Sequence, residues 1–349
     1  MSSQIYQSND QMNLPLVCIC IPNYNNESTI GKTLDSLLNQ TYKNVVIKVF
    51  DNASTDASCK IIADYQERYS NLQLYTSDEN IGGEANFTRC IRYMEGKYSA
   101  IFHSDDVYEP TIVEKEVEAL ETLPISAVFC PAKLIDENDA FIGDSNVPEE
   151  LVNNSTSQIS FSDLLKLNLK YGNVLICPSA MSYTETFLNE IKSWDGDTYK
   201  SATDVDVWFR FAQIKPVGLL QERLINYRFS QNSFSFRRLK TRVTPLDIFL
   251  VLDHYVNSEE TSHYLNEIDY KNYKFLKFRD NVVIERNCII NGIVQPSKIN
   301  IIDKEISYTA MKSKENFIIY LAGITFSIVN FKCILARLVR ASKKLINKP

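Results

Sequence analysis

Residues 16–26 read LVCICIPNYNN, a short apolar run rich in Val and Ile that passes at Pro22 into polar side chains. Such a run, bounded by proline, is typical of a strand that is buried on both faces of a sheet. Four similar runs follow, at residues 45–50, 72–76, 98–103 and 127–132. The runs begin 26 to 29 residues apart. This spacing matches a strand, a helix and their turns, so it predicts strand–helix–strand units.

The segments between these runs carry apolar residues at helical spacing. Examples are Ile30, Leu34 and Leu37, then Ile61, Ile62 and Tyr65, and later Val113, Val117 and Leu120. Strands that alternate with amphipathic helices predict an α/β fold, with a Rossmann-like, mostly parallel sheet and helices on both faces. Ligands of such sheets bind at the carboxyl ends of the strands, so the polar segments after each strand are the place to seek chemistry.

The pattern also divides the chain. We expect a disordered lead-in over residues 1–13 and a sheet domain over 14–240, with halves 14–135 and 136–240. Residues 136–160 look like a polar loop, and FSDLLKLNL (161–169) looks helical. A helical extension is expected over 241–311, followed by an amphipathic basic tail over 312–349.

Composition excludes several classes of protein. The 349 residues carry a net charge of -6, which does not favour nucleic acid as a partner. The eight cysteines are scattered and form no CxxC pair, which favours reduced thiols in the cytoplasm. The polar N-terminus is unlike a secretory signal. With only three histidines, a His-rich metal site is not expected.

Asp105 and Asp106 follow the fourth apolar run, at the rim of the predicted sheet. Adjacent carboxylates repel each other unless a cation or water separates them. Oxygen ligands of this kind suit Mg²⁺ or Mn²⁺, together with phosphate oxygens. The alternative is an acidic turn in which Asp caps the next helix.

Two further candidates stand after the second and third runs. Asp51 begins the segment DNASTD, where a carboxylate can accept a hydrogen bond from a base or can start a turn. Arg89 follows the loop NIGG and can meet a diphosphate or lie on a solvated helix face.

Four motifs now stand in order on the strand–helix rhythm: PNYN (22–25), DNASTD (51–56), SDD (104–106) and TDVDVWFR (203–210). Together they resemble the family 2 glycosyltransferases with the GT-A fold. The resemblance covers about residues 14–235. Within this family, the chain is similar to transferases that build bacterial surface polysaccharide such as capsule or O-antigen.

The resemblance implies a role for each matching residue. Residues 14–135 are the nucleotide-sugar half and 136–240 the acceptor half of a catalytic domain. Asp106 is the main metal ligand, Asp105 supports the donor ribose or the metal shell, and Asp204 is the catalytic base. The other expected donor-binding residues are Pro22, Tyr24, Asn25, Asp51, Asn52, Arg89 and Arg228. In one departure, Ser230 stands where the family often has His, which puts metal coordination from that side in doubt.

These roles imply an inverting transferase that uses Mn²⁺ or Mg²⁺ and a nucleotide-sugar donor, with a UDP-sugar favoured. For Asp204 the alternative is a helix N-cap. A nucleotidyltransferase has a similar sheet but needs a glycine-rich phosphate loop, and residues 22–30 hold no glycine. An inactive homologue that serves as a membrane-associated assembly partner is a further alternative.

The end of the chain is apolar and then basic. Residues 317–349 carry six basic and no acidic residues, after a continuous apolar stretch over 317–331. This stretch is shorter than the ~20 residues that span a bilayer. It favours a peripheral anchor on the inner face of the cell membrane and a lipid-linked glycan acceptor. The alternative is a helix pair that packs on the protein.

Overall fold

The computed structural model describes residues 14–152, 157–175, 179–229, 241–293, 297–300 and 302–346, with side chains described up to residue 330. The expected lead-in over 1–13 lies outside the described residues. The chain divides into two compact units. We call them the sheet unit (Met1–Leu165 with Asn173–Ser230) and the helical unit (Lys166–Gly172 with Gln231–Pro349). The boundary expected at residue 240 also lies outside the described residues.

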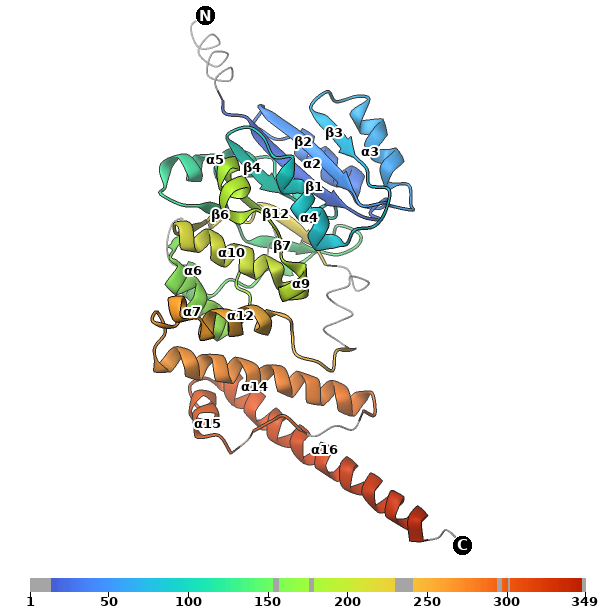
Figure 1. Cartoon of the computed structure of the whole chain (residues 1–349), viewed down its shortest axis with the longest axis vertical. Coiled ribbons are helices and arrows are strands. Elements are labelled where there is room, and N and C mark those ends of the chain that lie inside the picture. Colours follow the sequence, from blue (N-terminus) through green and yellow to red (C-terminus); the bar gives the residue numbers. More distant parts are fainter. Residues whose placement is uncertain are drawn as a thin grey trace, which may run out of the picture. The chain divides into compact units, whose positions relative to one another are not determined.

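An eight-stranded sheet forms the body of the sheet unit (Figure 1). Its strands lie in the order β3, β2, β1, β4, β10, β6, β11, β9. The pairs β3–β2, β2–β1, β1–β4 and β6–β11 are parallel, and the pairs that include β10 or β9 are antiparallel. The strands are β1 (Val17–Asn23), β2 (Val45–Asp51), β3 (Leu72–Tyr75), β4 (Tyr98–Ile101), β6 (Ala127–Phe129), β9 (Ser157–Ile159), β10 (Ala180–Tyr183) and β11 (Val217–Leu219). The five apolar runs thus form strands, and the predicted α/β fold is confirmed.

The connections place the reversal of strand order beside β1. The chain runs outward through α2 (Ile30–Leu38) to β2 and through α3 (Ser58–Gln66) to β3. It then returns through α4 (Gly83–Arg92) to β4, on the other side of β1. Right-handed crossovers put α4 on the opposite face from α2 and α3. Ligands of such sheets bind beyond the strand ends where the order reverses, here β1 and β4.

The other helical segments of this part of the chain are α5 (Ile112–Thr122), α6 (Glu149–Val152), α7 (Phe161–Tyr171), α8 (Thr184–Thr186), a π-helical turn (Phe187–Ile191), α9 (Gly196–Tyr199), a 3₁₀ turn (Lys200–Ala202) and α10 (Thr203–Ile214). The helix predicted over 161–169 is therefore present as α7.

A second sheet has four short strands in the order β5 (Val107–Tyr108), β12 (Ile225–Arg228), β7 (Ala132–Ile135) and β8 (Phe141–Asp144). The loop expected over 136–160 is wrong in part, because β8, α6 and β9 lie within it. Phe141 and Ile142 of β8 are 62% and 50% exposed, so the burial pattern on which the sequence prediction rests is absent there. Pairing of Asn226 with Val107 brings β12 to the chain just after β4.

The described part of the helical unit holds α12 (Ile248–Asn257), α13 (Glu259–Ser262), α14 (Glu267–Ile290), α15 (Lys304–Ala310) and α16 (Lys314–Ile346). Phe278 and Val282 of α14 pack with Ile306 of α15 and with Tyr320 and Phe326 of α16. Tyr320 and Phe326 are partly buried against this core, and the separate tail expected from residue 312 stays a prediction. Across the described ranges, no helix has both the length and the hydropathy to cross a bilayer.

Candidate active site

The ends of β1 and β2 are joined by a buried polar cluster. Asn23 and Asp51 are partners in the parallel register, and each is 1% exposed. Asn23 Nδ2 donates to Asp51 Oδ2 at 2.8 Å. Ser54 donates through its backbone N–H to Asp51 Oδ1 at 2.9 Å and through Oγ to Oδ2 at 2.6 Å. Asp51 thus accepts three hydrogen bonds from the protein, and its expected contact with a nucleotide base stays a prediction.

Asn52 and Arg89 tie the end of β2 to the chain that follows β3. Asn52 Oδ1 accepts a hydrogen bond from the backbone N–H of Ile81 at 2.9 Å. Arg89 Nη2 donates to the carbonyl oxygen of Thr76 at 2.6 Å, and Nη1 donates to that of Asp51 at 3.2 Å. The guanidinium that was expected to meet a diphosphate is therefore engaged with backbone carbonyls, and its role toward a donor stays a prediction.

Pro22 is half-buried near the end of β1, and Tyr24 and Asn25 are exposed just beyond the strand. Tyr24 is 45% exposed, so its ring offers a face on which a planar base can stack. Asn25 has a left-handed backbone with φ of 53°, which Asn tolerates better than most residues. Its Oδ1 accepts a hydrogen bond from the backbone N–H of Thr55 at 2.8 Å. These residues lie where the strand order reverses, and their expected contact with the donor stays a prediction.

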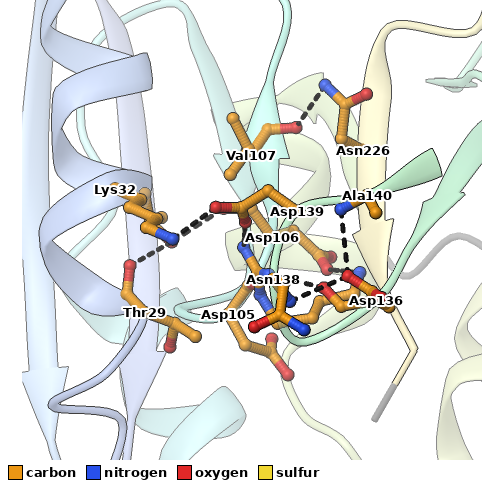
Figure 2. Close-up of polar contacts among 12 residues, drawn as sticks. Thr29, Lys32, Asp105, Asp106, Val107, Asp136, Asn138, Asp139, Ala140 and Asn226 are labelled. Carbon is orange, nitrogen blue, oxygen red and sulfur yellow. Dashed lines mark hydrogen bonds and ion pairs between the residues drawn. The ribbon is translucent and has the colours of Figure 1, made fainter.

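Asp105 and Asp106 follow β4 and differ in exposure. Asp106 has no exposed surface, and its Oδ1 accepts the backbone N–H of Arg228 at 2.9 Å. Its Oδ2 is buried without a partner among the described residues. Burial and the neighbouring Asp105 raise the pKa of Asp106 well above its usual range. Asp105 is half-buried, and Figure 2 draws no contact from its carboxylate to the residues in view. Which of the two carboxylates is the main metal ligand stays a prediction.

Arg228 holds the segment after β4 in place. Its Nε donates to the carbonyl oxygen of Asp105 and its Nη1 to that of Asp136, both at 2.9 Å. Its Nη2 lies 2.6 Å from Asp139 Oδ1, and Asp139 also pairs with Lys32 of α2 (Figure 2). These two cations lower the pKa of Asp139. The buried Arg228 is thus paired within the protein, so its expected contact with a diphosphate stays a prediction. Ser230 lies outside the described residues.

His103 is a candidate residue of the active site that the sequence motifs do not single out. Its Nε2 is buried and has no hydrogen-bond partner in the part of the chain that the structure describes. Its ring lies 5.4 Å from that of Phe87, which in turn lies 5.5 Å from the ring of the buried Trp194. Desolvation lowers the pKa of His103 and so favours the neutral imidazole. The signal in the sequence is a polar side chain at the end of an apolar run, directly before SDD.

Asp204 is the second residue of α10, and the N-cap of that helix is Ala202. The N-cap alternative for Asp204 is therefore wrong. Its Oδ1 accepts the backbone N–H of Val205 at 2.8 Å, and its Oδ2 accepts from Asn173 Nδ2 at 3.3 Å. Burial raises the pKa of Asp204 to about 6. Such a carboxylate is ionised at neutral pH yet basic enough to take a proton in a reaction.

The carboxylates after β4 fit a hard divalent cation. Within the described ranges, no three His, Cys, Asp or Glu side chains stand close enough to hold a metal by themselves. Mg²⁺ is usually bound by only one or two carboxylates, with phosphates and water completing its shell. The half-buried Asp105 and Asp106, whose Oδ2 has no partner among the described residues, are two adjacent carboxylates of this kind.

Comparisons with known proteins bear on this arrangement. Residues 18–191 match the family described as Glycosyl transferase family 2. The chain is 31% identical over 217 residues to an uncharacterized glycosyltransferase of Rickettsia prowazekii. The match covers 61% of this chain and 64% of that protein, which is less than two thirds of its length.

Two solved structures share the fold. TarS 1-349 of S. aureus, in complex with UDP, has a TM-score of 0.52 and 14% identity over 90% of this chain and 89% of that one. The mannosyltransferase PcManGT of Pyrobaculum calidifontis, in complex with GDP-Man and Mn²⁺, has a TM-score of 0.54 and 13% identity over 93% of each chain. At this identity they support the fold alone. With the family match over the sheet unit, the chain belongs to glycosyl transferase family 2 and has a GT-A-like fold.

Proposed function

We propose that this protein is a metal-dependent, inverting glycosyltransferase, which moves a sugar from a nucleoside diphosphate to a hydroxyl of a glycan acceptor. One observation carries the proposal: the sheet unit holds two carboxylates suited to the reaction, namely the half-buried Asp105 beside the reversal of strand order and Asp204, whose pKa is raised to about 6. The first suits a cation that binds phosphate, and the second suits a general base.

The donor nucleotide is assigned to the ends of β1 and β2. Tyr24 offers an exposed ring for the base, and Asp51 lies at the end of the neighbouring strand β2. A UDP-sugar is the favoured donor. Because the two related structures contain UDP and GDP-Man, both uridine and guanosine donors belong in any screen.

Asp105 is assigned to the metal, with Asp106 Oδ2 buried beside it. A divalent cation held there would neutralise the charge that develops on the leaving diphosphate. Arg228 fixes the backbone of Asp105 through its hydrogen bond to the carbonyl oxygen, which keeps the carboxylate in place.

Asp204 is assigned to the acceptor. A sugar hydroxyl is a weak nucleophile, so a base must take its proton as the oxygen attacks the anomeric carbon. The new C–O bond forms on the face opposite the breaking bond to the diphosphate. A single displacement of this kind inverts the anomeric centre.

A thermal-shift screen of nucleotide sugars with and without Mn²⁺ tests the proposal, because a ligand that binds the folded protein raises its Tm. We expect one nucleotide sugar to raise the Tm with Mn²⁺ and to lose this effect in excess EDTA. Transfer to a glycan acceptor should need the same metal. Binding without any transfer or donor hydrolysis would favour the inactive homologue, and no binding at all would contradict the proposal.

We also propose that the acceptor is lipid-linked, in surface polysaccharide synthesis, and that α16 meets an anionic membrane. Ile318, Leu321 and Ile328 of α16 are 56%, 46% and 50% exposed, and their spacing puts them on one face of the helix. The six basic residues of 317–349 follow this face in the sequence. Apolar burial and attraction to anionic lipid would act together.

Charge reversal in the full-length chain is a cleaner test of this contact than deletion of 317–349, because Tyr320 and Phe326 pack in the core of the helical unit. The triple variant Arg337→Glu, Arg340→Glu and Lys343→Glu should lose flotation with phosphatidylglycerol vesicles but keep its Tm. Equal flotation of wild type and variant would contradict a role for these charges.

A further inference from the structure

Asn173 is a half-buried residue that no motif singles out, and it lies against the proposed base. It follows Gly172, whose left-handed backbone (φ 91°) ends α7. Asn173 Nδ2 donates to Asp204 Oδ2 at 3.3 Å. The two residues are 31 positions apart in the sequence, so the contact exists only in the folded sheet unit.

The direction of the Asn173 amide is fixed by its own turn. Asn173 Oδ1 accepts the backbone N–H of Leu175 at 3.1 Å, an Asx-type turn. Since the oxygen end of the amide is held by a donor, the nitrogen end must face Asp204. This side chain therefore presents N–H groups to the carboxylate and not a second acceptor.

Two of the hydrogen bonds to Asp204 fall on different oxygens. Val205 N–H donates to Oδ1 and Asn173 donates to Oδ2. The backbone N–H of Asp204 also contributes, and since the two oxygens together have four lone pairs, at least one lone pair stays open to a substrate proton. The carboxylate is thus fixed in orientation without being saturated, which a base requires.

In the described chain, no charged neighbour shifts the pKa of Asp204. Burial favours the neutral form of its carboxyl group. The hydrogen bonds from Val205, from its own backbone and from Asn173 favour the ionised form. Asp206, the other carboxylate in the first turn of α10, is paired with Arg210 at 2.8 Å. Among the described residues, Asn173 supplies the side-chain contribution to this balance.

We propose that Asn173 is a positioning residue, which orients the Asp204 carboxylate and keeps it ionised so that it can accept the proton of the acceptor hydroxyl. This inference rests on the proposed function of Asp204. Asn173 itself touches no reacting atom; it acts through the base.

The test compares pH profiles of kcat for wild type, Asn173→Ser and Asn173→Asp. Ser and Asp can both still accept the Leu175 N–H, so the turn is kept in each case, but neither presents the amide N–H to Asp204. We expect the acidic limb of the profile to move up by about one pH unit in Asn173→Ser, and further in Asn173→Asp, where two carboxylates face each other. Turnover at pH 5.5 should then fall roughly tenfold, with a much smaller loss at pH 8.5.

Asn71 supplies a matched control. Its Nδ2 donates to the carbonyl oxygen of Val45 at 3.0 Å, at the amino end of the strands and away from the site. Asn71→Asp should lower the Tm without moving the pH profile. If the Asn173 variants change only the Tm and leave the profile in place, the proposal is overturned.

A double variant separates this inference from the proposed function. In an Asp204→Asn background, Asn173→Ser should cause no further loss of kcat, because the group on which it acts is gone. An undiminished loss in that background would overturn the role of Asn173. If Asp204→Asn itself kept full activity, the assignment of Asp204 would fail first.

Discussion

The ends of β2 and β4 lie at the same edge of one sheet, but they hold their carboxylates differently. At β2, both oxygens of Asp51 are bound by Asn23 and Ser54. At β4, Asp106 Oδ2 is buried without a partner among the described residues, and Asp105 is half-buried. Asn23 Oδ1, beside Asp51, is also buried without a partner among the described residues, so the difference lies in the two carboxylates. Both oxygens of Asp51 are paired within the protein, whereas only one oxygen of Asp106 is.

The largest effect is expected at Asp204, because its carboxylate is assigned to catalysis and not to the stability of the fold. Asp204→Asn should lower kcat by about 100-fold or more, the usual scale for the loss of a general base. The donor KM should change little, because Asp204 is assigned to the acceptor. Steady-state kinetics at pH 8 measure both quantities. Near-normal turnover in a folded variant would show that another group takes the proton.

The pH dependence of kcat also tests whether Asp204 is the base. Because burial raises the pKa of Asp204 to about 6, wild-type kcat should fall as the pH drops through about 6 and the base becomes protonated. A carboxylate whose pKa is raised on folding destabilises the fold once the pH exceeds that pKa. At pH 8 the Tm of Asp204→Asn should therefore be no lower than that of wild type, and a clear loss of Tm would indicate a structural role.

The next largest effect concerns the metal. Asp105→Asn should weaken Mn²⁺-dependent donor binding about tenfold or more, because it removes the charge of the half-buried carboxylate. Asp106→Asn should weaken it less, since its Oδ1 already serves the backbone N–H of Arg228. Titration of the donor-induced Tm shift with Mn²⁺ compares the two variants. A greater loss in Asp106→Asn would restore Asp106 as the main ligand.

The features that could be predicted from the sequence are buried strands and motifs that stand in a fixed order along the chain. Val17, Ile19 and Ile21 are fully buried, and their apolar run predicted β1 correctly. The family motifs pointed to Asp51, to Asp106 with Asp105, and to Asp204, and the roles of these residues stay predictions. Short strands could not be predicted in this way, because β8 is exposed and forms only by pairing with β7.

Contacts between distant residues were also beyond prediction. Arg228 was expected to bind phosphate, yet it is held by Asp136 and Asp139, about ninety positions away. Asn173 meets Asp204 only through the packing of the folded unit. The residue type determines which interactions a side chain can make, but the fold determines which partner that side chain meets.

A smaller effect, on stability, is expected at the end of β2. In Asp51→Asn, one oxygen becomes an NH₂ group that faces either Asn23 Nδ2 or the donors of Ser54. Two donors then oppose each other in a buried site, which costs about 1–3 kcal/mol. Urea unfolding of this variant should show that loss, whereas Asp105→Asn should leave the free energy of unfolding nearly unchanged. Equal losses in the two variants would contradict the distinction between the strand ends.

The smallest effect is expected at Ala53, between Asp51 and Ser54, where the backbone is left-handed with φ of 61°. A residue with a Cβ pays about 1 kcal/mol for this conformation, and glycine does not. Glycine also gains freedom in the unfolded chain, which offsets part of the benefit. Ala53→Gly should therefore raise the free energy of unfolding by only a few tenths of a kcal/mol, while the β-branched Ala53→Val should lower it by more than about 1 kcal/mol. Because the turn at Ala53 sets the position of Ser54 against Asp51, the Val variant should also weaken donor binding. If both variants match wild type in urea unfolding, the left-handed turn carries no strain and the end of β2 is less rigid than its hydrogen bonds imply.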